Sequence, residues 1–399
     1  MTLHKALVIA PLFALAVITD CGGGSSHTNT IVTSGSNVAQ LTVNAGPAGG
    51  YVNGAFTSVQ VCVPGTSTCQ TVSGILVDTG SVGLRILSSA LNVSLPQQNG
   101  SDGDPIVECL PFVSTFTWGP VQTADITIAS ETASAVPIQV IGGTNVAVPD
   151  ACSDFEGTPR TPADTLGTLG TNGLLGVGSF PQDCGEGCTQ TSGNVGLYYD
   201  CATSGCTVTN ESLTAQVQNP VSLFATDNNG VIIELPSVDG SAATVTGSLV
   251  FGIGTQSNNG LGSATVYTLD SNGFITTQFD GQPYQNSFLD SGSNGIFFLD
   301  SATTGLLGCG GPDGFYCPTS TQNFSATNVG ANGSSEQIKF GVADSNTLLG
   351  TDDSAFNQLA GPFPGAFDWG LAFFYGRNVF TSIDGASTPA NTTGPYWAY

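Results

Sequence analysis

The sequence predicts an all-β protein, mainly strands with few short helices, built from two related lobes. Glycine is abundant (54 of 399 residues), and with the many Thr, Ser, Val and Asn residues it favours short strands joined by tight turns. One motif, an apolar run followed by Asp, a hydroxyl residue, Gly and Ser, occurs twice, with its aspartates 212 residues apart. Repetition at about the length of one lobe indicates a duplicated domain.

Composition and charge restrict the class of protein. With 40% hydrophobic and 9% charged residues, the chain can bury a core in each of two lobes. The net charge of −24 argues against nucleic acid and against anionic membrane surfaces as partners. Because only five residues are basic, protonation of the acidic groups creates little positive repulsion. Acidic working conditions are therefore compatible with this chain.

The amino terminus predicts export. Lys5 precedes an apolar stretch from Ala6 to Ile18 that is too short to span a membrane, so residues 1–20 are predicted to be a signal peptide. Cys21, followed by Gly-Gly-Gly-Ser-Ser, resembles the acylation site of bacterial lipoproteins. Residues 21–37 are then expected to form a flexible Gly/Ser-rich tether behind a lipidated cysteine.

The cysteines support the same compartment. Eleven cysteines minus Cys21 leave ten, an even number in an exported chain, which favours disulfides. Two pairs are close enough in sequence to bridge hairpins or loops, and a cluster of four is expected to make two bridges with its pairing left open. The last two cysteines would then pair by elimination. The pairs and the cluster are Cys62 with Cys69, Cys309 with Cys317, the four cysteines Cys184, Cys188, Cys201 and Cys206, and finally Cys109 with Cys152. A zinc site is the alternative for the cluster, but its spacing fits poorly and no histidine is near, so we expect no metal.

The first copy of the repeated motif is Gly74–Leu87, "GILVDTGSVGLRIL". Its run of Ile, Leu and Val predicts a buried strand that ends at Asp78. A buried carboxylate costs several kcal/mol in order of magnitude unless it is hydrogen-bonded or shares a proton. An ordinary turn at Asp-Thr-Gly is the simpler interpretation of this copy alone.

The second copy is Asn286–Leu299, "NSFLDSGSNGIFFL". It places Asp290 at the position of Asp78, and the three following residues match in the same order. Each half then carries a second signal, two apolar residues and a glycine. These signals are Leu174, Leu175 and Gly176 in the first half, and Trp369 with Gly370 in the second.

These motifs resemble those of the pepsin-like aspartic peptidases. In that family each lobe passes its Asp-Thr/Ser-Gly strand through a loop of two hydrophobic residues and a glycine. Further matches at Gly247–Thr255 and in the terminal "FFYGRNVFTSID" extend the resemblance over about Leu41–Asp384. Within the family the chain looks closest to an uncharacterised set of bacterial lipoproteins.

The resemblance implies the chemistry of a shared-proton pair. Asp78 and Asp290 would meet in a cleft between the lobes, activate water and protonate the leaving nitrogen. The glycines permit tight turns, while the hydroxyl groups match family positions that bond across the lobe junction or to the outer carboxylate oxygens. Turn-capping is the alternative for these hydroxyl groups. The supporting residues are Thr79, Gly80 and Ser81 in the first copy and Ser291, Gly292 and Ser293 in the second, with Gly176 and Gly370 as the loop glycines.

Two positions depart from the family pattern. A hairpin flap is expected in Ser114–Ala129, with its turn at Trp118 and Gly119. Family members usually carry a tyrosine near that tip, and Trp118 is the candidate replacement, with packing on a lobe surface as the alternative. Arg85 stands where the family has a tryptophan, and a cation there would lower the pKa of Asp78.

The sequence thus predicts an exported aspartic-type endopeptidase with lobes at 38–224 and 225–399. Its expected partner is a peptide or unfolded protein, without a cofactor, and we expect a monomer that meets the membrane only through the lipid on Cys21. Residues 22–40 contain no lysine or arginine, so we expect no basic segment across the pair. The alternatives are a pepsin-fold protein that binds peptides or ligands without turnover, and a surface lipoprotein with a structural role.

Overall fold

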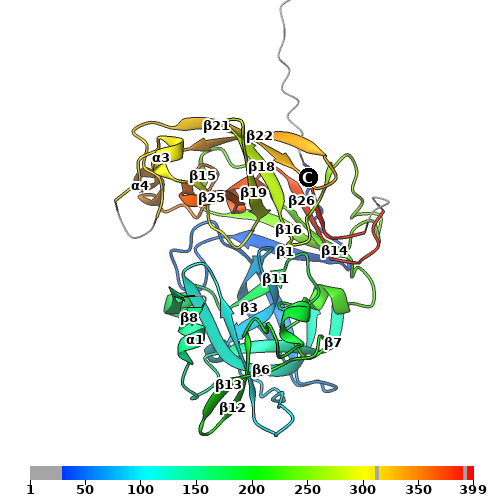
Figure 1. Cartoon of the computed structure of the whole chain (residues 1–399). Coiled ribbons are helices and arrows are strands. Elements are labelled where there is room, and N and C mark those ends of the chain that lie inside the picture. Colours follow the sequence, from blue (N-terminus) through cyan, green and yellow to red (C-terminus); the bar gives the residue numbers. More distant parts are fainter. Residues whose placement is uncertain (1–28, 156, 311–313, 390–392) are drawn as a thin grey trace, which may run out of the picture.

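The protein is described by a computed structural model that covers residues 29–155, 157–310, 314–389 and 393–399. The expected signal peptide and Cys21 lie outside the described residues. Strands make up 45% and helices 9% of the structure, which confirms the predicted fold class. Figure 1 shows two β lobes, with the amino-terminal half (blue to green) below the carboxy-terminal half (yellow to red).

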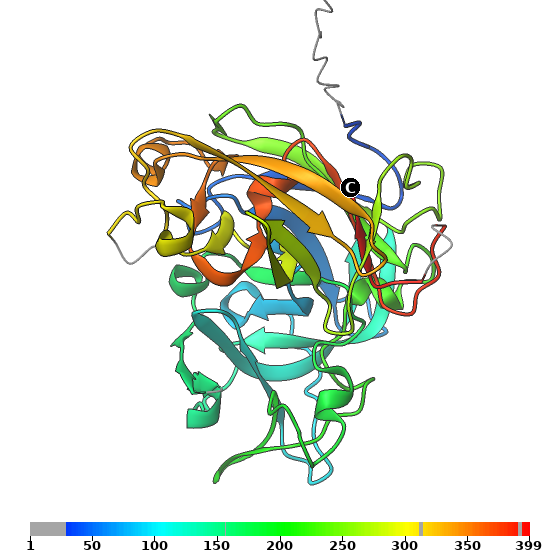
Figure 2. The ribbon, with the colours of Figure 1, turned by 45° about the horizontal axis from the view of Figure 1, so that its top comes forward.

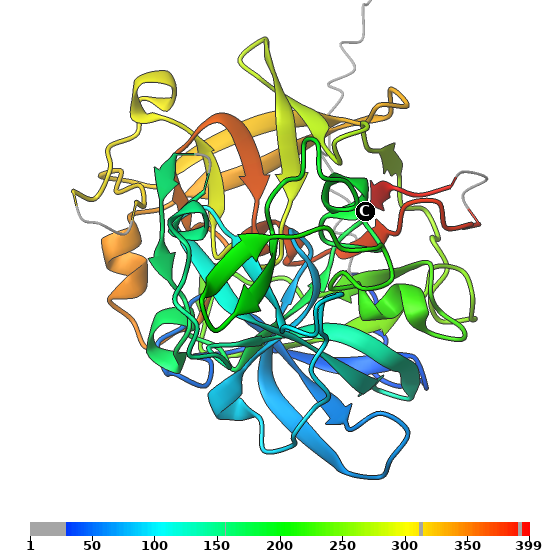
Figure 3. The same cartoon turned by 60° about the horizontal axis from the view of Figure 1, so that its bottom comes forward.

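The amino-terminal half consists mostly of antiparallel strands, which Figure 3 shows from beneath. Their bounds are β1 (Val38–Val43), β2 (Ala55–Cys62), β3 (Cys69–Asp78), β4 (Val82–Leu87), β5 (Ile106–Pro111), β6 (Thr115–Ile128), β7 (Glu131–Ile141), β8 (Asp154–Phe155), β9 (Thr158–Pro159), β10 (Thr161–Pro162), β11 (Gly173–Val177), β12 (Tyr198–Ala202) and β13 (Gly205–Val208). Most of them belong to a 16-stranded sheet with the order β13-β12-β5-β6-β7-β4-β11-β3-β2-β1 in this half.

The carboxy-terminal half continues that sheet and adds one of seven strands with the order β22-β21-β18-β19-β25-β20-β24. Figure 2 shows the long yellow and orange strands β21 and β22 spreading across its top. The strands are β14 (Gly230–Glu234), β15 (Ser241–Ala242), β16 (Val245–Phe251), β17 (Val266–Thr268), β18 (Ile275–Phe279), β19 (Gln282–Leu289), β20 (Ile296–Leu299), β21 (Gln322–Val329), β22 (Ser335–Val342), β23 (Ala355–Phe356), β24 (Ala360–Gly361), β25 (Phe363–Trp369), β26 (Asn378–Ser382) and β27 (Tyr396–Ala398).

The helices are single turns that connect strands. They are α1 (Asp150–Ser153), α2 (Leu166–Leu169), α3 (Ser301–Thr304), α4 (Ser345–Leu349) and α5 (Leu371–Phe374). α2 shows why such turns start where they do, because the Thr165 side chain accepts a hydrogen bond from the N–H of Thr168 and so caps a free backbone donor. Gly170 ends the same helix in the left-handed conformation, at φ 77°.

The two lobes share strands rather than meeting as separate bodies. β1 pairs with β16 over its whole length, from Val38 opposite Val250 to Val43 opposite Val245. β14 and β26 extend the sheet beyond β16. The predicted lobe boundary at 224/225 lies between β1 and β16 in the sequence. The pairing of β1 with β16 therefore joins strands from the two predicted lobes. A sheet across the junction holds the lobes together, and it includes β3, the strand that ends in Asp78.

The cores of the two halves differ in composition. Aliphatic side chains such as Val59, Ile75 and Ile126 are fully buried in the amino-terminal half. In the carboxy-terminal half Phe298 packs edge-on against Phe340, with ring centroids 5.1 Å apart. Aromatic pairs in such edge and stacked arrangements contribute about 0.5–1.5 kcal/mol beyond their buried area.

The second half of the predicted tether is bound to the protein. The Asn29 side-chain amide donates to the backbone oxygens of Leu235 and Arg377. The N–H of Val32 donates to Glu234 Oε2 at 2.6 Å, and Ser248 Oγ donates to the Val32 carbonyl at 2.5 Å. The expectation of a flexible segment is therefore wrong for residues 29–37, because the strands β14 and β16 offer side-chain partners that the local composition does not reveal.

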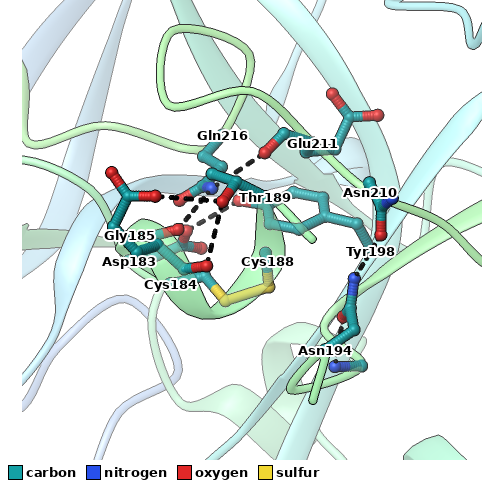
Figure 4. Close-up of a disulfide and its surroundings, with 12 residues drawn as sticks. Asp183, Cys184, Gly185, Cys188, Thr189, Asn194, Tyr198, Asn210, Glu211 and Gln216 are labelled. Atoms are coloured by element: carbon teal, nitrogen blue, oxygen red, sulfur yellow. Dashed lines mark hydrogen bonds between the residues drawn. A yellow bond between two sulfur atoms is a disulfide. The ribbon is translucent and has the colours of Figure 1, made fainter. Parts of the chain in front are cut away.

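Five disulfides are present, and the expected pairings are confirmed. Cys62 bonds Cys69, Cys309 bonds Cys317, and Cys109 bonds Cys152 across 43 residues. The four-cysteine cluster forms two short bridges, Cys184–Cys188 and Cys201–Cys206, which rules out the zinc alternative for these sulfurs. Figure 4 shows the Cys184–Cys188 bridge beside Asp183 and Gln216, whose side-chain amide donates to the carbonyl of Gly185.

Removing the Cys109–Cys152 bridge should cost more stability than removing Cys62–Cys69. The loop-closure model assigns about 4 kcal/mol to a loop of 43 residues and about 2.5 kcal/mol to one of seven. Double Cys→Ala variants of each pair, unfolded in urea, test the order. Equal losses, or a larger loss for the shorter loop, would show that the long bridge does not restrain the unfolded chain.

Candidate active site

A strand ends at or directly before each of the two aspartates. β3 ends at Asp78 after fully or nearly fully buried Ile75, Leu76 and Val77, and Asp290 directly follows β19, whose last residue Leu289 is also buried. The apolar run at the end of β3 forms a strand whose side chains pack on both faces of the sheet, whereas β19 is exposed or half-buried over most of its length and buried only at Ser287 and Leu289. The carboxylate in each lobe thus lies at the end of a rigid element.

The structure brings Asp78 and Asp290 together. A Cβ placed on Gly80 would lie 2.7 Å from both carboxylate oxygens of Asp290, and one on Gly292 would lie 2.6 Å from Asp78 Oδ1 and 3.1 Å from Asp290 Oδ1. Each glycine therefore packs directly on the aspartate of the other lobe. Any larger residue there would push the carboxylates apart, which explains why the motif needs glycine at both positions.

Each carboxylate has the same two hydrogen-bond contacts within its own motif. The N–H of Gly80 donates to Asp78 Oδ1 at 2.8 Å, and Ser81 Oγ donates to Asp78 Oδ2 at 2.5 Å. In the second lobe the N–H of Gly292 donates to Asp290 Oδ1 at 2.7 Å, and Ser293 Oγ lies 3.0 Å from Asp290 Oδ2. These bonds orient the carboxylates and offset part of their burial cost.

Thr79 and Ser291 bond across the lobe junction, as the sequence predicts. The N–H of Thr79 donates to Ser291 Oγ at 3.1 Å, and the N–H of Ser291 donates to Thr79 Oγ1 at 2.9 Å. Each hydroxyl then donates to a strand of the opposite lobe, Thr79 to the Leu289 carbonyl and Ser291 to the Val77 carbonyl. A local twofold axis relates the two bonds made by Thr79 to the two made by Ser291. Together the four bonds fix the separation of the aspartates.

The two loop glycines occupy equivalent positions. Gly176 lies opposite Asp78 on the parallel neighbour β11, and Gly370 directly follows β25, which pairs in parallel with β19. A Cβ on Gly176 would lie 2.6 Å from the Val82 nitrogen, and one on Gly370 would lie 2.1 Å from the Gly295 carbonyl oxygen. Both positions are therefore closed to side chains by neighbouring backbone.

A cavity of about 560 Å³ lies between the lobes and contains both aspartates. Its lining includes Leu76 and Leu174 from the first lobe and Phe297 from the second. Burial, followed by the charge of Asp78, holds the pKa of Asp290 well above its usual range. The pair is therefore suited to keep one proton between its members.

The prediction of a hairpin flap within Ser114–Ala129 is wrong, because this segment forms the single strand β6 and has no turn at Trp118 and Gly119. β5 and β6 are joined by a turn at residues 112–114, where the N–H of Phe112 donates to the Thr115 carbonyl at 2.7 Å, and residues 112–115 line the cavity. Trp118 is 5% exposed in the middle of β6 and donates to the Val146 carbonyl. The prediction of the tip was wrong because Gly119 serves close packing against β7 rather than a turn.

Arg85 does not serve as a cation for Asp78, and that expectation is wrong. It is fully buried, and its Nη2 lies 2.6 Å from Glu108 Oε1 and 2.9 Å from Asp183 Oδ2. The Tyr198 hydroxyl donates to Asp183 Oδ1, and both residues are labelled in Figure 4. Burial and the neighbouring Glu108 raise the pKa of Asp183 well above its usual range. Because Glu108 lies on β5, this network holds the base of the hairpin.

Two cavity residues were missed by sequence reasoning. Tyr51, before β2, lines the cavity, and burial followed by the charges of Asp78 and Asp290 raises its pKa. Asp368, on β25, lines it from the other lobe and is 4% exposed. The sequence contains a signal for Asp368, because an acidic residue stands two positions before Gly370 where the first lobe has the apolar Leu174 two positions before Gly176. No local pattern marks Tyr51.

Comparisons with known proteins agree with this geometry. The sequence model of the family described as "Protein of unknown function (DUF3443)" matches residues 33–399. The chain therefore belongs to the DUF3443 family. No curated protein matches the sequence. An aspartic proteinase from Irpex lacteus is similar in structure, with a TM-score of 0.53 at 15% identity over 90% of this chain and 96% of that chain, which shows the pepsin-like fold for this DUF3443 member.

Two further findings concern metals and membranes. In the described ranges, no group of three or more His, Cys, Asp or Glu residues could hold a metal ion. None of the helices in that part of the chain is long and apolar enough to cross a bilayer. The five disulfides are consistent with an exported protein.

Gly370→Ala should destabilise the protein by about 1–3 kcal/mol, because the added methyl group meets the Gly295 carbonyl. Gly260→Ala is a matched control, since a Cβ there has no heavy atom within 4 Å. Thermal and urea unfolding of both variants measure the difference. Equal stability of the two variants would show that the second loop relaxes easily.

Arg85→Leu should cost about 3–5 kcal/mol near neutral pH, because it leaves Glu108 and Asp183 buried without their cation. The loss should shrink at low pH, where the carboxyl groups are protonated. Lys339→Leu, at an exposed position, is the control and should change stability by less than about 1 kcal/mol. An Arg85→Leu protein as stable as the control at pH 7 would contradict the buried network.

Proposed function

We propose that this protein is an exported aspartic-type endopeptidase that uses Asp78 and Asp290. The observation that carries the proposal is the meeting of two carboxylates from separate lobes inside one cavity, each with the same supporting bonds. Mere structural stability gives no reason to bury two acids against each other, since the second charge adds repulsion in a medium of low dielectric.

We infer different roles for the two aspartates. Burial and the charge of Asp78 raise the pKa of Asp290, which supports Asp290 as the acid that carries the shared proton and protonates the leaving nitrogen. Asp78 then acts as the base that takes a proton from the attacking water. Gly80 and Ser81 donate hydrogen bonds that orient the Asp78 carboxylate for this step. The two proton transfers leave the pair with one proton again.

The cavity favours an extended peptide as substrate. Apolar side chains flank the carboxylates from both lobes, including Leu76, Phe297 and Phe363. The hairpin tip at residues 112–115 adds Phe112 and the 74% exposed Val113 above them. We infer that unfolded protein with apolar side chains beside the scissile bond binds here. A single chain contains the complete pair, so a monomer suffices, and the acidic surface disfavours nucleic acid.

The cell envelope is the proposed location. A signal peptide over residues 1–20 would direct export, and a lipid on Cys21 would anchor the protein in the envelope of a bacterium. The bound segment 29–37 leaves from the carboxy-terminal half, and none of it is among the residues that line the cavity. An anchored protein could therefore keep its cavity accessible.

A pepsin-fold protein that binds peptides without turnover is the second candidate. The observation that favours it is the hairpin tip, where Phe112 and Val113 stand in place of the tyrosine usual in the family. Such a protein would still bind peptides in the cavity. Binding without cleavage at any pH would favour this candidate.

Incubation with unfolded protein from acidic to neutral pH should yield cleavage by the parent protein. Asp78→Asn and Asp290→Asn should each lower kcat/KM at least about 10³-fold, because each removes one of the two proton-transfer groups. Asp352→Asn, at an exposed position, is the control. Folding of all variants is checked by thermal unfolding. Cleavage that survives either dyad substitution would remove the mechanism.

A further inference from the structure

A third carboxyl group lies in the candidate active site. Asp368 is on β25, two residues before Gly370, and lines the same cavity as Asp78 and Asp290. It is 4% exposed, and its Oδ1 has no hydrogen-bond partner among the residues that the structure describes. A buried acid with an unused oxygen beside a proton-sharing pair calls for a chemical explanation, because burial without partners is costly.

Ser293 connects Asp368 to the pair. Ser293 Oγ lies 2.6 Å from Asp368 Oδ2 and 3.0 Å from Asp290 Oδ2. A hydroxyl group has one hydrogen and can donate to only one of these oxygens. If both contacts are hydrogen bonds, the other carboxyl group must itself carry a proton and donate it to Ser293. The proton can sit on Asp290 or on Asp368, and reversal of the Ser293 hydroxyl exchanges the two arrangements.

The first lobe has no such group. The strand register makes Leu174 the counterpart of Asp368, because Leu174 pairs with Leu76 and Arg85 where Asp368 pairs with Phe288 and Phe297. Ser81, the counterpart of Ser293, donates to Asp78 Oδ2. The local twofold symmetry of the site is therefore broken at this position, where the first lobe has the apolar Leu174 and the second has the ionisable Asp368.

The surroundings of Asp78, Asp290 and Asp368 favour the retention of a proton by these three carboxyl groups. Burial raises the pKa of Asp368 to about 8, and the charge of Asp78 adds to the rise, against the opposing effect of the Ser293 bond. The charge of Asp368 in turn helps to raise the pKa of Asp290, after burial and Asp78. Tyr51 is the other titratable group of the lining, and none of the described lining residues is Lys, Arg or His.

We propose that Asp368 is a third proton-holding carboxyl group, coupled to Asp290 through Ser293, that extends activity towards neutral pH. The inference rests on the proposed peptidase function, in which Asp368 is a positioning residue. A bare pair loses its working proton once its second ionisation is complete. With Asp368 present, the three carboxyl groups retain one more proton at higher pH than Asp78 and Asp290 would alone. This proton resides on Asp290 part of the time.

The pH profile of cleavage tests the proposal. Asp368→Asn, and Asp368→Leu, which copies the first lobe, should shift the alkaline limb of kcat/KM at least about one pH unit towards acid. Asp352→Asn should leave the limb in place. An unshifted alkaline limb in both folded Asp368 variants, with the parent protein active, would overturn the inference and leave the proposed function standing.

A second readout needs no activity. The folded-state pKa of Asp368 lies above its unfolded value of about 3.9, so its contribution to stability is complete below that value and is lost as pH rises towards about 8. The Tm of Asp368→Asn relative to the parent should therefore rise steadily between these pH values. A constant Tm difference would overturn the inference, whereas a rising one in a protein that cleaves nothing would refute the peptidase function alone.

Discussion

The structure depends on one electrostatic constraint, the burial of two carboxylates from different lobes against each other. Glycine must follow in each motif because each glycine packs on the opposite aspartate. The hydroxyl groups of Thr79 and Ser291 then bond across the junction and fix the distance between the acids. The sheet shared through β1 and β16 carries this arrangement into the body of both lobes. A like-charged pair in such surroundings is stable only if it retains a proton.

The repeat explains how much of the site could be predicted from the sequence. Duplication places the same side chains around a twofold axis, so two matching strings, at Asp78 and at Asp290, predicted the paired aspartates. The resemblance to the pepsin-like peptidases then implied the supporting hydroxyl groups and the loop glycines. The fold class followed from strand-forming residues, and the pairs Cys62–Cys69 and Cys309–Cys317 from short cysteine spacings, whereas Cys109–Cys152 was reached by elimination and the pairing within the four-cysteine cluster was left open. Features repeated in both lobes were thus the most accessible to sequence reasoning.

Features found in one lobe only were harder to predict. The hairpin turn lies at residues 112–114, which contain neither glycine nor proline, while Trp118 and Gly119 carry turn-like chemistry but lie within β6. Arg85 was predicted to act on Asp78, yet its partners Glu108 and Asp183 are 23 and 98 residues away in sequence. The partners of a buried charge are set by tertiary packing, which no local pattern encodes.

The acidic side chains differ sharply in their situation within this chain of charge −24. Those exposed on the surface, such as Asp102, Asp280 and Asp352, confer solubility. Asp78, Asp290 and Asp368 lie instead in one cavity whose described lining has no basic residue, so protons are the only positive charges that this lining provides. Arg85 compensates a second buried pair of carboxyl groups, Glu108 and Asp183. One cluster is balanced by a cation and the other by protons.

The sharing of a proton between the two lobes can be measured directly by ¹³C NMR titration of the protein labelled at its aspartate carboxyl carbons. We expect the signals of Asp78 and Asp290 to show coupled steps, and Asp78→Asn to remove the step that Asp78 causes in the Asp290 signal while the coupling to Asp368 remains. Independent single steps for both residues near the ordinary value of about 3.9 would contradict it.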